Sequence, residues 1–261
     1  HERNNSKSIG SNWIYSILED KNNTVWLGTY GDGLDRYIRE TGEFKHYNKN
    51  DSEESISSNS IRSMLLDSQN RVWFGTSNGL CMYLDETDKF VRYFALDYDS
   101  LSLSSDDIYC IHEDKNNIIW IGTYGGGLNA FDEQNQQFFS YSLEDGLPGN
   151  IIYGIQEDNT GFLWLSTNNG LTRFDPKEAV FRNFDSYDGL PGDEYNYNSY
   201  FQTLSGELFF GGKNGLISFD PNQISKNEYE ANVVFTGLRL FNKKVEIGDP
   251  TKLLNQNINT I

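Results

Sequence analysis

Cysteine, histidine and positive charge are all scarce in this sequence. Its 261 residues include two cysteines, Cys81 and Cys110, and three histidines. Two cysteines do not make a disulfide framework, and we expect both to be small buried side chains. With 21 lysines and arginines against 38 aspartates and glutamates, the net charge is −17. This charge argues against a nucleic-acid partner and against docking on an anionic membrane surface.

Patterns that would indicate a membrane anchor or a catalytic centre are missing too. No apolar run reaches the roughly 18 residues of a transmembrane helix, and no secretory signal occurs at the start. The sequence contains no HExxH, paired CxxC, GxSxG or phosphate-binding loop. We therefore expect no metal, no cofactor and no catalytic residue, and we expect His112 to pack between structural units. Because the first residue is His1, we also expect the chain to be a segment of a longer protein.

What the sequence does contain is a tryptophan-centred phrase that recurs along the chain. The phrase occurs five times, the last time in a degraded form: Val25-Trp26-Leu27-Gly28-Thr29, Val72-Trp73-Phe74-Gly75-Thr76, Ile119-Trp120-Ile121-Gly122-Thr123, Leu163-Trp164-Leu165-Ser166-Thr167 and Leu208-Phe209-Phe210-Gly211-Gly212. Successive central aromatics are 47, 47, 44 and 45 residues apart. A period of 40 to 50 residues with about four short strands per unit is typical of a β-propeller blade.

The repeat predicts an all-β fold, a β-propeller of four-stranded blades. We place the propeller in residues 1–222, with blades at about 12–50, 59–97, 106–143, 150–187 and 195–222. Each innermost strand has a small residue at its third position: Ser16, Ser63, Cys110, Gly154 and Ser199. Small residues at one level of every blade are expected where the innermost strands crowd a central axis.

An aspartate begins the turn between the first two strands of four repeats. These residues are Asp20, Asp67, Asp114 and Asp158, and Thr203 takes the place in the fifth repeat. An Asp side chain caps its own turn by accepting backbone N–H groups. Three of the four follow a glutamate, which resembles a pair of catalytic carboxylates. Because the pair repeats at one turn position, we interpret it as structural.

Taken together, these residues resemble the two-component regulator propeller repeat. The resemblance rests on the pattern Ile-x-x-Ile-x-Glu-Asp-x-x-Asn-x-x-Trp-Leu-Gly-Thr-x-x-Gly-Gly-Leu and on crossovers such as residues 145–150, Asp-Gly-Leu-Pro-Gly-Asn. Residues 188–216 look like the terminal blade of that family. Beyond them, residues 223–261 would be a linker and the truncated start of the family's triple-tyrosine β-sandwich, which residues 232–245 resemble.

The resemblance implies the extracytoplasmic sensor segment of a membrane-bound two-component receptor, on the periplasmic or extracellular side of a bacterial membrane. It implies a ligand such as an oligosaccharide or another small polar molecule, and a homodimer in the full receptor. Contact with the membrane would be made through parts outside this chain. Family propellers usually have seven blades, so we expect five repeats to be the C-terminal portion of a larger ring. A closed five-bladed ring is the alternative.

In a propeller, the crossovers into the innermost strands and the loops between second and third strands open on one face. Sugars need polar groups for their hydroxyls and a flat ring for their C–H face, and both are present in these loops. The predicted ligand-binding residues on this face are Trp13, Tyr30, Asp32, Asn78, Asp107, Tyr124, Asn169, Asn196 and Lys213. For each asparagine the alternative is a role in the turn alone.

Two other functions are compatible with the sequence. The propeller could be a structural module that supplies a dimerisation surface without a ligand of its own. It could also be the scaffold of a carbohydrate-active lyase or hydrolase, with carboxylates in the funnel chosen from Asp32, Asp106, Asp107, Asp193 and Glu194. No residues of the sequence mark such a set, so we expect no catalysis in this segment.

Overall fold

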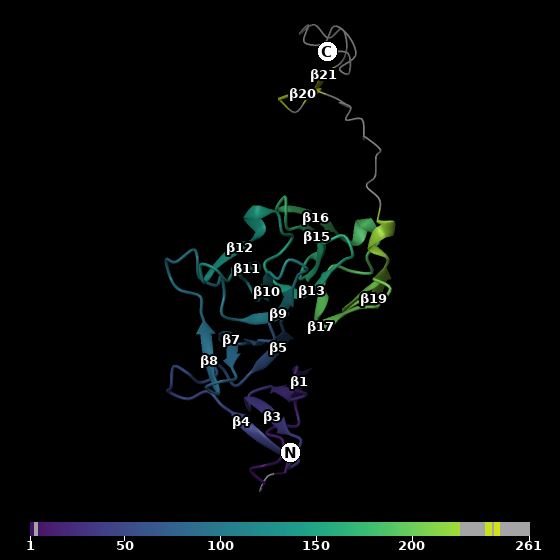
Figure 1. The fold of residues 1–261 in the computed structure, drawn as a ribbon. Coiled ribbons are helices and arrows are strands. Elements are labelled where there is room, and N and C mark those ends of the chain that lie inside the picture. The colour runs from purple at the N-terminus through teal and green to yellow at the C-terminus, as the bar shows by residue number, and fades with distance from the viewer. Residues whose placement is uncertain (3–4, 225–237, 242, 246–261) are drawn as a thin grey trace. The chain divides into compact units, whose positions relative to one another are not determined.

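The computed structural model describes residues 1–2, 5–224, 238–241 and 243–245. Residues 1–223 form one compact unit and residues 224–261 a second. The first unit contains four antiparallel four-stranded sheets and one three-stranded sheet, each built from strands that follow one another in the sequence. These five sheets are the blades, and they succeed one another around an axis (Figure 1). The all-β propeller predicted from the repeat is confirmed, although the fifth blade has three strands in the described part of the chain.

The blades follow the repeat strand by strand. Blade 1 contains β1 (Ile14–Glu19), β2 (Val25–Thr29), β3 (Leu34–Ile38) and β4 (Glu43–Tyr47). Blade 2 contains β5 (Ile61–Leu66), β6 (Val72–Thr76), β7 (Gly79–Leu84) and β8 (Lys89–Tyr93). Blade 3 contains β9 (Ile108–Glu113), β10 (Ile119–Thr123), β11 (Leu128–Asp132) and β12 (Gln137–Tyr141). Blade 4 contains β13 (Ile152–Glu157), β14 (Leu163–Thr167), β15 (Gly170–Asp175) and β16 (Val180–Phe184), and blade 5 contains β17 (Tyr195–Gln202), β18 (Leu208–Gly212) and β19 (Gly215–Phe219).

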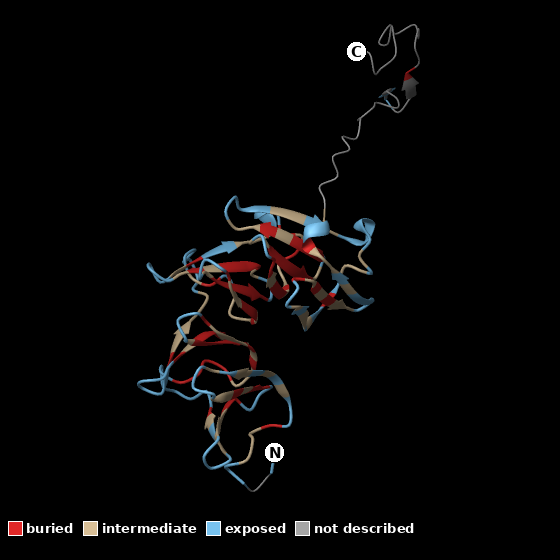
Figure 2. Cartoon of the chain, turned by 45° about the vertical axis from the view of Figure 1, so that its right-hand side comes forward, coloured by how far each residue is buried: buried red, intermediate tan, exposed pale blue. Residues whose placement is uncertain are grey.

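The core lies between blades, where the repeated indoles are buried. Buried residues lie mainly along the strands of the blades (Figure 2). Each indole packs on the aromatic ring that ends the third strand of the next blade. The four centroid distances are 4.9 Å for Trp26 and Tyr83, 5.6 Å for Trp73 and Phe131, 5.5 Å for Trp120 and Phe174, and 4.7 Å for Trp164 and Phe219. All four indoles are at most 2% exposed. The recurring tryptophan is therefore the residue that holds one blade against the next.

The aspartate that begins each turn has a second role. Asp114 Oδ1 accepts the backbone N–H groups of Asn116 and Ile118 at 2.8 and 3.0 Å, while its Oδ2 accepts the indole N–H of Trp120 at 2.9 Å. The indoles of Trp26, Trp73 and Trp164 donate in the same way to Asp20, Asp67 and Asp158. The structural role predicted for these aspartates is confirmed, and the bond to the indole explains why Asp and Trp recur six residues apart.

Backbone hydrogen bonds also join each blade to the crossover that enters the next one. The N–H groups of Gly31 and Gly33 donate to the carbonyl of Asn59, and those of Gly125 and Gly127 donate to that of Asn150. Gly79 and Gly170 donate to the carbonyls of Asp106 and Asp193, in both cases at 2.6 Å. The loops between second and third strands therefore lie on the same face as the entries to the first strands.

In blades 1 to 4, the small residue of the innermost strand lies between blades rather than at the axis. An added Cβ on Gly122, opposite Cys110, would lie 2.8 Å from Ile152 of the next blade. The residue before the small one is a β-bulge in each of blades 1 to 4, since the register shifts around Tyr15, Arg62, Tyr109 and Tyr153. Cys81 and Cys110 are both free and buried, as expected.

Residues 224–261 are described only in part. Leu238–Leu240 and Lys243–Val245 pair as the antiparallel strands β20 and β21. The other positions predicted to begin a β-sandwich, within residues 232–245, lie outside the described residues. Within the described ranges, the helices are three single turns of 3-10 helix, and no helix has the length and apolarity to cross a bilayer.

Candidate functional site

The four β-bulges bring side chains from different blades together at the propeller axis. Tyr109 lies 5.8 Å from Tyr153, measured between ring centroids, and Tyr197 lies 5.1 Å from Tyr109 and 6.0 Å from Tyr15. A bulge turns one side chain away from the alternation of its strand. Because the same bulge occurs in successive blades, the re-aimed side chains converge. We call Tyr15, Arg62, Tyr109, Tyr153 and Tyr197 the axial cluster.

Tyr197 reaches the axis by a larger irregularity in blade 5. In the β17–β18 pair, Tyr195 lies opposite Gly212 but Tyr200 lies opposite Phe210, so β17 has three extra residues. Asn198 within this bulge has a φ of 53°. The Tyr197 hydroxyl donates to the carbonyl of Arg62 in blade 2, and Asn198 Nδ2 donates to that of Tyr15 in blade 1 at 3.2 Å. The bulge therefore links blade 5 to the first two blades across the axis.

Aromatic side chains from the neighbouring loops extend the axial cluster toward solvent. Tyr30 lies 5.1 Å from Tyr15, and Trp13 stacks on Tyr30 at 6.1 Å. On blade 3, Tyr124 lies 5.4 Å from Tyr109. Trp13, Tyr30 and Tyr124 are 66%, 46% and 49% exposed. Flat apolar rings are thus available next to the axis, on the face predicted from the sequence. We call the surface that Trp13, Tyr30 and Tyr124 form around the axial cluster the axial mouth.

Arg62 and Asp107 form an ion pair within this aromatic surface. Arg62 Nη1 lies 2.6 Å from Asp107 Oδ1, and the guanidinium carbon lies 4.5 Å from the ring centroid of Tyr109. Partial burial raises the pKa of Asp107, and Arg62 opposes this shift. Burial likewise raises the pKa of Tyr109 and Tyr153. The side chains of Arg62 and Asp107 are 17% and 31% exposed, so their exposed parts offer a hydrogen-bond donor and an acceptor beside aromatic rings.

Of the nine predicted ligand-binding residues, the structure places four in or beside the axial cluster: Trp13, Tyr30, Asp107 and Tyr124. Asn196 is exposed and precedes Tyr197 in the blade 5 bulge. Lys213 forms an ion pair with Glu194 on the exposed rim of blade 5.

The other three predicted residues belong to the loops themselves. Asn78 and Asn169 each donate their backbone N–H to the threonine that ends the second strand, at 3.0 and 2.9 Å. Asn169 Nδ2 also donates to the carbonyl of Pro148 in the incoming crossover. Asp32 is exposed and lines a groove with Asn48 and residues of the N-terminus. The structure does not bring these three residues to the axial cluster.

None of the five residues of the axial cluster was among the predicted ligand-binding residues, and four of them precede the small residue of an innermost strand: Tyr15, Arg62, Tyr109 and Tyr153. Strict alternation along the strand would place them on a blade face, and the bulge that turns them inward has no marker in the sequence. A signal was available nevertheless. The position before the small residue is large in four repeats, and in blade 2 it changes from tyrosine to arginine.

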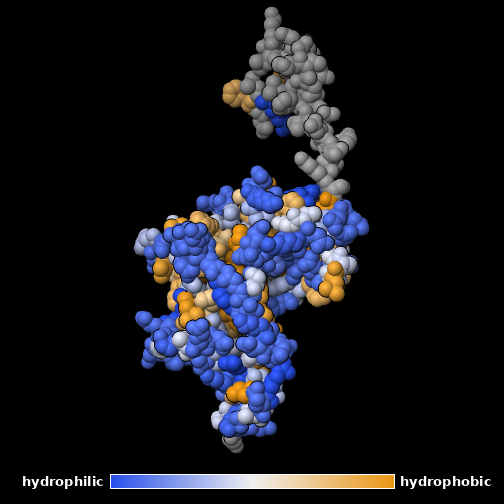
Figure 3. All heavy atoms as spheres, in the orientation of Figure 1, coloured by the Kyte–Doolittle hydropathy of each residue, from blue (hydrophilic) through white to orange (hydrophobic). Residues whose placement is uncertain are grey.

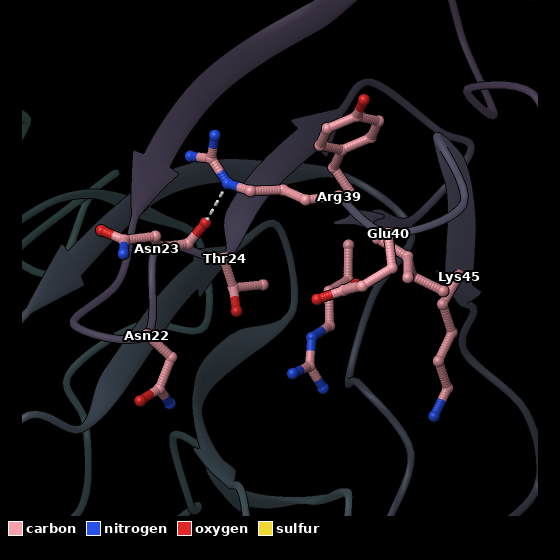
Figure 4. Close-up of a pocket in the computed structure, with 9 residues that line it drawn as sticks. Asn22, Asn23, Thr24, Arg39, Glu40 and Lys45 are labelled. Atoms are coloured by element: carbon pink, nitrogen blue, oxygen red, sulfur yellow. Dashed lines mark hydrogen bonds between the residues drawn. The ribbon is translucent and has the colours of Figure 1, made fainter.

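A polar groove of about 500 Å³ lies at the opposite end of blade 1 (Figure 4). Its walls include the turn at Asn22, Asn23 and Thr24 and the next turn of the blade, at Arg39 and Glu40. Arg39 donates to the carbonyl of Asn23 at 2.6 Å and pairs with Glu19. Because this groove is formed by the turns at the far ends of the strands, it is separate from the axial mouth.

Comparison with known proteins connects this geometry to a family. The model of the family described as "Two component regulator propeller" matches residues 8–31, 55–78, 102–125 and 146–169. These four segments are similar to repeats of that family. Each runs from a crossover to the loop between second and third strands, so the matched segments include Tyr15, Arg62, Tyr109 and Tyr153 of the axial cluster but not Tyr197.

A curated relative is also a protein of two-component signalling. "Histidine kinase P4" of Formosa agariphila is 36% identical over 114 residues, which are 44% of this chain and 8% of that protein. Two solved extracellular domains of putative hybrid two-component systems from B. thetaiotaomicron superpose with TM-scores of 0.71 and 0.69, at 25% and 24% identity. This chain covers 30% and 33% of their lengths, and 81% and 90% of its own length is aligned. The chain thus spans a small part of each relative.

Less similar structures share the fold alone. A virginiamycin B lyase from Staphylococcus aureus is 16% identical, with a TM-score of 0.58 over 80% of this chain and 71% of the lyase. The similarity to extracellular domains of two-component systems supports a sensor-like role for this propeller.

Proposed function

We propose that this chain is a ligand-binding sensor segment of a membrane-bound two-component receptor, and that the axial mouth is its binding site. The observation that carries the proposal is the ion pair between Arg62 and Asp107 within the exposed aromatic rings at the axis. The matches to regulator propeller repeats and to an extracellular domain of a hybrid two-component system support the sensor role and the extracytoplasmic location.

The ion pair interrupts the repeat at both of its positions, and this favours a role in binding. In blades 1, 3 and 4 the position of Arg62 is occupied by tyrosine. The position of Asp107 is occupied by Trp13, Ser60 and Ile151 in blades 1, 2 and 4. Residues that hold blades together, such as the Asp–Trp pairs, recur in every complete blade. A charged pair that occurs once has no counterpart in the architecture of the other blades.

The chemistry of the mouth favours a small neutral polar ligand, such as an oligosaccharide. Exposed tyrosine and tryptophan rings provide flat surfaces for the C–H face of a pyranose. Arg62 can donate to a hydroxyl and Asp107 can accept from one, as adjacent sugar hydroxyls require. A neutral ligand suits the site better than an anionic one, because Arg62 is already paired and the net charge is −17.

Binding energy would provide the signal if the ligand favoured one receptor geometry over another. The ring of Tyr109 contacts residues of blades 2, 4 and 5, so a ligand on the axial cluster would touch a point where several blades meet. Catalysis is not needed for this role.

The test is calorimetric titration of the chain with neutral and anionic oligosaccharides. We expect at least one neutral ligand to bind, and Tyr124→Ala or Trp13→Ala to weaken it up to about tenfold, as loss of a ring contact of about 1.4 kcal/mol implies. Phe139→Ala is the matched control, because Phe139 is 47% exposed on the outer strand β12. Binding that survives both mouth substitutions but not the control substitution would contradict the proposed site.

A further inference from the structure

The side chain of Arg62 is held at the axis by contacts that do not involve Asp107. Its guanidinium carbon lies 4.5 Å from the ring centroid of Tyr109. The backbone carbonyl of Arg62 accepts the Tyr197 hydroxyl, and Asn198 Nδ2 donates to the same carbonyl at 3.4 Å. The bulge in β5 turns the arginine side chain toward the axis. We therefore expect the guanidinium to stay at the axis when Asp107 is changed.

Asp107 supplies the carboxylate that neutralises this guanidinium. Arg62 Nη1 and Asp107 Oδ1 lie 2.6 Å apart, and both atoms are buried. In the described part of the chain, no other carboxylate pairs with Arg62. Arginine binds carboxylates through a planar fork of N–H donors, and it also stacks on aromatic rings. The carboxylate of an acidic ligand would bind the same guanidinium, where Asp107 already lies.

The carboxylate of Asp107 is not part of the hydrogen bonds that build its own loop. Its backbone carbonyl accepts the N–H of Tyr124 at 2.8 Å, and its backbone N–H donates to Ser105 Oγ at 3.3 Å. The adjacent Asp106 differs, because its Oδ1 accepts the backbone N–H of Ala95 at 2.7 Å. The side chain of Asp106 therefore holds the crossover, whereas that of Asp107 can be changed without loss of a loop hydrogen bond.

We propose that Asp107 determines the charge preference of the axial mouth, because its carboxylate fills the anion position on Arg62 and excludes uronic acids. This inference rests on the proposed function of the mouth and adds a residue that selects among sugars. A uronate would have to displace Asp107 or lie beside its negative charge, and both are unfavourable. A neutral sugar can donate a hydroxyl to Asp107 and accept from Arg62 without displacing either.

Charge outside the mouth also disfavours anions, so a control must match the net charge. On the face drawn in Figure 3, hydrophilic residues cover most of the described part of the chain. Acidic residues outnumber basic ones by 38 to 21. Loss of any one carboxylate would weaken this general repulsion slightly. Asp106→Asn removes the same charge as Asp107→Asn at the neighbouring position and is the matched control.

Calorimetric titration with glucuronate and with its neutral methyl ester tests the role of Asp107. Asp107→Asn keeps the size of the side chain and leaves Arg62 without a paired carboxylate. We expect this variant to bind glucuronate at least about tenfold more tightly than the unmodified chain does. Its affinity for the methyl ester should change less, and Asp106→Asn should show no such gain for glucuronate. Far-ultraviolet circular dichroism checks that each variant is folded.

Two further variants keep the test decisive. Asp107→Ser installs the residue that Ser60 provides in blade 2, and it should show the same gain as Asp107→Asn. Adding Arg62→Tyr, which installs the residue of blades 1, 3 and 4, should abolish the gain.

Three results would overturn the inference. They are no gain in glucuronate affinity on loss of the Asp107 carboxylate, an equal gain in Asp106→Asn, and tighter binding of glucuronate than of its ester by the unmodified chain. These comparisons are separate from the test of the proposed function. If the unmodified chain bound no neutral oligosaccharide, that function would fail, and the glucuronate titrations of the variants would still decide the role of Asp107.

Discussion

The tryptophan and aspartate that recur six residues apart act as one unit. The carboxylate of Asp114 satisfies two backbone N–H groups of its turn and the buried indole of Trp120. In blade 5 both partners are replaced, since Thr203 stands at the aspartate position and Phe209 at the tryptophan position. Phenylalanine has no side-chain N–H group, so blade 5 does not need a carboxylate to accept one.

This pairing predicts non-additive substitutions in blade 3. Asp114→Thr should lower the free energy of unfolding by about 2–3 kcal/mol, because it leaves the buried indole N–H of Trp120 without an acceptor. Asp114→Thr combined with Trp120→Phe reproduces the pair found in blade 5. A double-mutant cycle by urea denaturation should give a favourable coupling of about 1 kcal/mol or more. Additive effects would show that the two residues act independently.

His112 makes stability depend on pH. Burial lowers the pKa of its ring to about 4, which the carboxylate of Asp114 partly opposes, and Nε2 has no hydrogen-bond partner among the described residues. A histidine in an unfolded chain titrates near 6.5. As the pH falls from about 6.5 to about 4, the unfolded state therefore takes up a proton before the folded state does. The contribution to stability is fully present above this window and is lost within it.

Comparison with His112→Leu isolates this contribution, and Leu65 occupies the same position in blade 2. Between pH 7 and pH 4, the unmodified chain should lose up to about 3 kcal/mol more stability than the variant. Urea denaturation of both proteins at several pH values measures the difference. Parallel pH profiles would show that His112 is not held neutral by the fold.

At the scale of strands, the side chains around a blade junction, including those of the following blade, limit the size of the residues next to it. An added Cβ on Gly122 would lie 2.8 Å from Ile152 Cγ2, and one on Gly75 would lie 2.7 Å from Ile108 Cγ2. Gly211 holds the same position in blade 5, where the nearest atom to an added Cβ is Ser199 Cβ at 3.1 Å. The constraint therefore comes both from the neighbouring blade and from the paired strand of the same blade, since Cys110 Sγ would lie 2.4 Å from the added Cβ on Gly122.

This difference gives a matched pair of substitutions. Gly122→Ser should destabilise the chain by about 1–3 kcal/mol through overpacking of the junction between blades 3 and 4. Gly211→Ser should cost less, because its side chain meets the edge of Ser199 and no isoleucine of a following blade. Thermal unfolding of the two variants compares them directly. An equal loss of stability would mean that the strand position, rather than the junction, requires glycine.

Repeats and bulges differ in how well the sequence predicts them. The strands of blades 1 to 4 and the turn aspartates follow from a phrase that occurs in each unit, so five examples constrain every position. The bulges at Tyr15, Arg62, Tyr109 and Tyr153 do not change the spacing of the phrase. Their effect is to turn one side chain toward the axis, and this depends on the pairing of two strands. The sequence therefore predicted the face on which the axial mouth lies, but it did not predict the residues of the axial cluster.

At the scale of the whole molecule, the blades present different residues to the axis and the same residues to each other. The junctions repeat Trp against Tyr or Phe, which explains the even spacing of the sequence phrase. The axial mouth combines three tyrosine bulges, one arginine bulge and loop aromatics from blades 1 and 3. The expectation that these five blades belong to a larger ring stays a prediction.

The five indole N–H groups make the central claim directly measurable. Four of them donate to turn aspartates at blade junctions, whereas Trp13 lies at the axial mouth and is 66% exposed. In a ¹H–¹⁵N correlation spectrum recorded during titration with a bound oligosaccharide, the Trp13 indole signal should shift while the signals of Trp26, Trp73, Trp120 and Trp164 stay in place. A ligand that binds and moves the junction signals but leaves Trp13 unchanged would place the binding site away from the axis.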